Sequence, residues 1–122
     1  MTFAGVMIAG ALGAVARYIL DGVVQDRVEG VFPWGTFVIN VTGSLLLGVI
    51  AGLALYQGLP SAPRAILAVG FCGAYTTFST FSYETFRLIE DGSRVTALTN
   101  IVASAATALV AAGLGLAIAA AL

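Results

Sequence analysis

Four long apolar segments follow one another along the chain, separated by short polar connections. They cover about residues 3–23, 35–56, 65–89 and 95–122. A membrane-spanning helix needs roughly 20 consecutive apolar residues, so each segment is long enough to cross a bilayer. The pattern predicts an all-α integral membrane protein with four transmembrane helices, forming a single transmembrane domain over residues 1–122.

Composition supports a membrane protein and excludes several other classes. Of 122 residues, 60% are hydrophobic and only 9% are charged, too few to cover the surface of a soluble domain. All five basic residues are arginines and none are clustered, which argues against nucleic-acid binding. The chain has no histidine and one cysteine, Cys72, which excludes an intramolecular disulfide and argues against a zinc or haem site.

The arginines are distributed almost evenly between the two ends of the predicted bundle. Arg27 and Arg94 lie in the first and third connections with Arg87 at the margin, whereas Arg64 lies in the second connection. Orientation in the membrane follows the excess of Lys and Arg in short loops, and here that excess is small. Two interpretations stay open: a single orientation, or insertion in both orientations with pairing as an antiparallel dimer.

Small residues predict close contacts between the helices. Gly48 and Gly52 form a small-xxx-small pair in the second segment. The first segment has a similar group, made of Ala9, Gly10, Gly13 and Ala14. Four such helices enclose little volume, so a pore is expected to need a second copy of the chain.

Polar side chains within the first two segments are candidates for function. Thr36, Asn40 and Ser44 are spaced i, i+4, i+8 and share one face of the second helix. Asn40 either bonds a neighbouring helix or contacts a transported solute, and we favour the second. Arg17 lies about six residues from the end of its segment, roughly 9 Å. It can reach the interface or keep an anion vestibule positive, and both interpretations stay open.

The third segment is the most informative about function. Residues 74–84 are mostly Thr, Ser, Tyr and Glu, and β-branched and hydroxyl residues beside Gly73 predict a break in the helix. A break at bilayer depth exposes carbonyls that need partners, and in transporters such carbonyls often hold a cation. Phe78 and Phe81, spaced i, i+3, are expected to place their rings along one edge.

Further polar residues suggest a track through the bundle. Thr77, Thr80 and Glu84 lie close together on another face of the third helix. Asn100 and Ser104, spaced i, i+4 in the fourth helix, are expected to continue the track begun by Thr80 and Glu84.

Three stretches of the sequence, at residues 10–18, 34–44 and 70–84, resemble the Fluc (CrcB) fluoride channels of microbes. The resemblance covers essentially the whole chain. It implies a multi-pass channel of the plasma (inner) membrane that relieves fluoride toxicity by passive efflux. It also implies an antiparallel, dual-topology homodimer with two pores.

The same resemblance implies roles for individual residues. A sodium ion at the dimer centre would be held by the backbone carbonyls of Gly73 and Thr76. The fluoride pore would involve Asn40, Phe78, Phe81, Ser79, Thr80, Ser104, Glu84 and Arg17. Asn100 stands where a tyrosine is common in the family, and Ala108 where a serine can occur.

Other classes remain as alternatives. A proton-coupled exporter resembling the small multidrug-resistance proteins needs a carboxylate in the first helix, whereas here Asp21 lies at its predicted end and the deep acid is Glu84 in the third. A purely structural membrane subunit would use the polar residues only to join helices. An enzyme is disfavoured, because Ser79 and Ser82 have no neighbouring base except Glu84.

Overall fold

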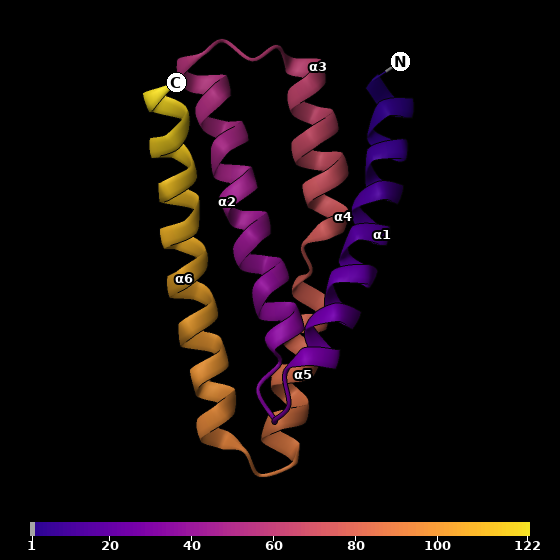
Figure 1. Ribbon diagram of the computed structural model, residues 1–122, viewed down its shortest axis with the longest axis vertical. Helices are drawn as coiled ribbons and strands as arrows, with labels where there is room; N and C mark the ends of the chain where they lie inside the picture. The colour runs from indigo at the N-terminus through magenta and orange to yellow at the C-terminus, as the bar shows by residue number, and fades with distance from the viewer. Residues whose placement is uncertain (1) are drawn as a thin grey trace.

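The computed structural model describes residues 2–122, which are helical apart from short connections and one break (Figure 1). Four helical spans are long and apolar enough to cross a membrane, which confirms the predicted class. The third span consists of four consecutive pieces. The elements are α1 (Thr2–Arg27), α2 (Trp34–Tyr56), α3 (Ser61–Arg64), the π-helical η1 (Ala65–Cys72), α4 (Gly73–Tyr75), α5 (Phe78–Glu90) and α6 (Arg94–Ala121).

Two helix boundaries differ from the prediction. Helix α1 continues to Arg27 rather than ending near residue 23, and Gln25 Nε2 donates to Asp21 Oδ2 across this added turn (3.0 Å). Arg17 therefore lies ten residues from the end of α1, about 15 Å rather than 9 Å. The third span begins at Ser61 rather than residue 65, because Pro63 falls in the first turn, where its missing N–H leaves no helical bond unmade.

Helices α2 and α6 lie side by side along their length (Figure 1). A side chain on Gly48 would overlap the backbone of Ala112, and one on Gly115 would overlap the backbone of Leu45. Gly52 meets the Cβ of Ala119 in the same way. Glycine thus brings the two backbones into direct contact, as predicted for Gly48 and Gly52.

A second contact joins α1 to the first half of the third span. Gly13 lies against the backbone of Phe71, and Gly70 lies against the backbone of Val6, while Ala9 is buried beside Gly70. The small residues of the first segment therefore pack as predicted. This contact fixes η1 and α4, whereas α5 packs against α6, so the two halves of the third span have different neighbours.

The connections and chain ends follow the topology expected from four spans. The C-terminus lies at the same end of the bundle as the α2–α3 connection and the start of α1, and the α1–α2 and α5–α6 connections lie at the other (Figure 1). Arg27 and Arg94 therefore lie at one end and Arg64 at the other. Large apolar side chains such as Leu55, Val95 and Leu109 are exposed on the outside, where lipid can cover them.

Candidate functional site

The third span is interrupted between α4 and α5. Thr76 (φ −78°, ψ 159°) and Thr77 (φ −149°, ψ 122°) are extended, so the predicted break is present. It lies three residues after Gly73, which is itself helical (φ −61°, ψ −35°). The position follows from capping: a helix start needs an extended residue whose side chain accepts a backbone N–H, and threonine supplies one where glycine cannot.

Hydrogen bonds from two side chains hold this break in place. Thr77 Oγ1 accepts from the N–H of Thr80 (3.1 Å) and so caps α5. From α2, Asn40 Nδ2 donates to the carbonyl of Thr77 and Asn40 Oδ1 accepts from its N–H, both at 3.0 Å. The Asn40 amide therefore satisfies both the N–H and the carbonyl of Thr77. An extended residue inside the bilayer needs such partners, because no water is there to bond its backbone.

This arrangement changes the partners of two carbonyls. In a continuous α-helix, the N–H of Thr77 would donate to the carbonyl of Gly73, and that of Thr80 to the carbonyl of Thr76. Here the first N–H donates to Asn40 and the second to the Thr77 hydroxyl. The Gly73 and Thr76 carbonyls have thus lost their helical hydrogen-bond donors. Gly73 is also exposed on the surface of the single chain.

A groove of about 370 Å³ lies beside the break, between α2, α5 and α6. Four of the predicted pore residues line it: Asn40, Phe78, Phe81 and Ser104. The remaining lining residues are Gly43, Ser44, Leu47, Thr76, Thr77, Ala105 and Ala108. The rings of Phe78 and Phe81 lie with centroids 6.0 Å apart at 39°. The groove thus combines amide, hydroxyl and aromatic groups at membrane depth.

Gly43 is a groove residue that sequence reasoning did not single out. A Cβ on Gly43 would overlap Thr76 Cγ2, so the missing side chain lets the break approach α2. Tyr75 was missed too: it is buried, and its hydroxyl lies 2.7 Å from Thr42 Oγ1. The glycine in the Asn-Val-Thr-Gly-Ser sequence could have identified Gly43 as a contact residue, whereas no local pattern pointed to Tyr75.

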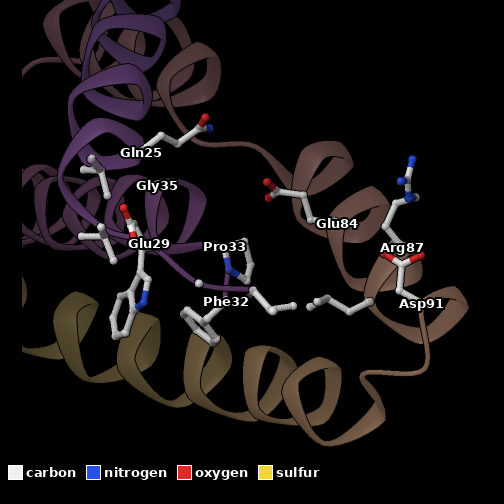
Figure 2. Close-up of a pocket in the computed structure, with 14 residues that line it drawn as sticks. Gln25, Glu29, Phe32, Pro33, Gly35, Glu84, Arg87 and Asp91 are labelled. Carbon is white, nitrogen blue, oxygen red and sulfur yellow. The ribbon is translucent and has the colours of Figure 1, made fainter.

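Four predicted pore residues lie outside the groove. Ser79 and Thr80 form part of the cap of α5, with Thr77 Oγ1 donating to Thr80 Oγ1 (3.1 Å). Glu84 lines a separate cavity of about 620 Å³ next to the α1–α2 connection. Figure 2 shows Glu84 and Gln25 extending into the space between α5 and the end of α1. Arg17 lies on α1 and lines neither space.

Three charged side chains within the membrane-spanning helices are partly buried. Among residues 2–122, Arg17 Nε, Asp21 Oδ1 and Glu84 Oε1 are buried atoms without a hydrogen-bond partner. Asp21 packs against Gly35 of α2. It lies six residues inside α1 rather than at its end, which corrects the predicted position.

Asn100 belongs to a buried hydrogen-bond network between α5 and α6. Its Nδ2 donates to Thr85 Oγ1 (2.9 Å), and its Oδ1 accepts from Ser104 Oγ (3.1 Å). These hydrogen bonds connect Asn100 to Thr85 and Ser104, and not to Thr80 or Glu84 as the expected polar track would require. Its partner on α5 is Thr85, which sequence reasoning missed.

Comparison with known proteins places the chain in a family. Residues 4–116 match the family model described as CrcB-like protein, Camphor Resistance (CrcB). The chain belongs to the CrcB family. The CrcB match includes the break, the groove and the Thr85–Asn100–Ser104 network, so the geometry described above lies within the part of the chain that defines the family.

Curated CrcB relatives are similar over almost their whole length. Fluoride-specific ion channel FluC 1 of Leifsonia xyli is 56% identical over 91% of this chain and 81% of its own length. The protein of the same name from Frankia casuarinae is 52% identical over 93% and 92%. Fluoride-specific ion channel FluC of Geobacter metallireducens is 46% identical over 95% and 94%. Because the chain belongs to a family of ion channels, the exporter and enzyme alternatives no longer apply.

Proposed function

We propose that this chain forms a fluoride-selective ion channel of the plasma (inner) membrane, which relieves fluoride toxicity by passive efflux. The observation that carries the proposal is the groove beside the helix break, where Asn40, Ser104, Phe78 and Phe81 meet. The names of the CrcB relatives support the choice of ion. The protein is accordingly a channel and not an enzyme.

The groove suits a small, strongly hydrated anion. A pore must replace the water around fluoride, and N–H and O–H donors can do so. A carboxamide has two N–H donors, and Asn40 uses one on Thr77, which leaves the second for an anion. The edges of Phe78 and Phe81 carry partial positive charge. Several weak contacts in succession let the ion enter and leave, as conduction requires.

A second copy of the chain would complete the pore. Phe78 is 80% exposed in the single chain although it lies on a membrane-spanning segment, so one chain supplies only part of the wall. The small difference in arginine number between the two ends supports insertion in both orientations. An antiparallel homodimer follows from these two features as part of the proposal.

The break would provide the site for a structural sodium ion. The carbonyls of Gly73 and Thr76 have lost their helical donors, and carbonyl oxygens are suitable ligands for a small hard cation. Two antiparallel copies that meet here would supply four such oxygens. The residues fit sodium, and when bound the ion would supply fixed positive charge close to the groove.

Purified protein in fluoride-loaded liposomes tests the channel directly. We expect rapid fluoride release without an imposed proton gradient, measured with a fluoride electrode. Liposomes loaded with chloride should release no more anion than protein-free liposomes. A requirement for a proton gradient, or equal release of chloride, would contradict a fluoride-selective channel.

Dual topology is tested with a reporter fused to the C-terminus. We expect signal from both faces of the membrane, because Arg27, Arg87 and Arg94 at one end exceed Arg64 at the other only slightly. A matched variant with two additional lysines in the α5–α6 connection, the end that already carries more arginines, should shift the signal toward one face. A reporter detected on a single face for the unmodified chain would exclude the antiparallel dimer.

A further inference from the structure

The direction of the hydrogen bonds around Asn100 is fixed by one carbonyl. Thr85 Oγ1 lies 2.8 Å from the carbonyl of Phe81, which can only accept, so the single hydroxyl proton of Thr85 is used there. Thr85 must then accept from Asn100 Nδ2. This leaves Asn100 Oδ1 facing Ser104, which donates to it.

The hydroxyl of Ser104 is therefore turned away from the groove that it lines. Its proton is bound to Asn100 Oδ1, so the groove meets the oxygen of Ser104 rather than a donor. An anion needs donors, and the oxygen of a hydroxyl is an acceptor. Ser104 can donate to an anion only after its bond to Asn100 breaks.

Breaking that bond has a cost set by burial. Asn100 is 1% exposed and Ser104 is 8% exposed. Because a buried acceptor without a donor carries its full desolvation penalty, the unpaired Oδ1 of Asn100 would oppose rotation of Ser104. An apolar residue at position 100 would remove this opposing group, and the Ser104 hydroxyl would then favour an anion over a neutral carbonyl.

We propose that Asn100 is a positioning residue that competes with fluoride for the proton of Ser104 and so weakens the ion site at this point of the groove. The inference rests on the proposed channel function. A weaker site favours release of the ion, and conduction depends on sites that are not too tight. Asn100 would thus adjust the rate of conduction without touching the ion.

The test is a double-mutant cycle of Asn100→Leu and Ser104→Ala, with fluoride efflux measured over a range of fluoride concentrations. In Asn100→Leu we expect the half-saturating fluoride concentration to fall about tenfold, the effect of one hydrogen bond to a charged group, and the maximal rate to fall as well. In the Ser104→Ala background, Asn100→Leu should change neither quantity. An equal effect in both backgrounds would overturn the proposal.

Thr99→Val is the matched control, because it removes an exposed hydroxyl one residue before Asn100 on α6 and leaves the bonds of Asn100 with Thr85 and Ser104 in place. Its half-saturating fluoride concentration should stay at the wild-type value. If Asn100→Leu does not fold, Asn100→Ala takes its place in the cycle. Absence of efflux from the wild-type protein would instead reject the channel function itself and the inference with it.

Discussion

Asn40→Asp should abolish fluoride efflux. The substitution keeps the oxygen that accepts from the N–H of Thr77 but replaces the donor that now lies 3.0 Å from the Thr77 carbonyl. The variant loses a hydrogen bond at the break and gains a negative charge in the groove. Two like charges 4 Å apart repel by about 4 kcal/mol at an effective dielectric constant of 20, which corresponds to a roughly thousandfold loss of flux.

Gln57→Glu is the matched control for this change. It makes the same conversion of amide to carboxylate, but at an exposed position after α2, where Gln57 Nε2 lies 3.3 Å from the carbonyl of Ala119. Its efflux should stay close to that of the wild-type protein, as measured with the fluoride electrode. Wild-type flux in Asn40→Asp, with normal behaviour in size-exclusion chromatography, would remove Asn40 from the ion pathway.

Sodium should stabilise the protein specifically. A cation bound by the Gly73 and Thr76 carbonyls in the native state alone raises the free energy of unfolding by about 1.4 kcal/mol for each tenfold rise in sodium above its dissociation constant. The melting temperature of the detergent-solubilised protein should therefore rise with sodium chloride. Potassium chloride or N-methylglucamine chloride at the same ionic strength should give a smaller rise.

Ionic strength alone would give equal melting temperatures in all three salts, and that outcome would argue against a sodium site at the break. Asn40→Ala offers an independent check. It removes both bonds that hold Thr77 extended, so the carbonyls would be less well fixed and the difference between sodium and potassium should shrink.

The sequence predicted the parts of the protein that depend on local composition. The four spans follow from runs of apolar residues too long for a soluble helix, and their number places both termini at one end. The helix contacts at Gly48 and Gly13 follow from the absence of side chains, which has the same consequence wherever two helices approach. The break in the third span follows from threonines that favour capping over a helix interior.

Helix ends and the exact position of the break were less predictable. Whether α1 ends near residue 23 or at Arg27 depends on a marginal last turn, stabilised here by the bond between Gln25 and Asp21. The β-branched and hydroxyl residues beside Gly73 predicted the interruption at that glycine. The break instead lies at Thr76 and Thr77, since these residues have partners on other elements.

By itself, the sequence determined that this protein crosses the membrane four times and which polar groups enter the bilayer with it, because lipid imposes those constraints on any chain. Only the tertiary structure decided what the polar groups do there. It joined Asn40 to Thr77, which are 37 residues apart, and Asn100 to Thr85 rather than to Glu84. These pairings depend on how neighbouring helices are rotated and offset, which periodicity along a single helix does not specify.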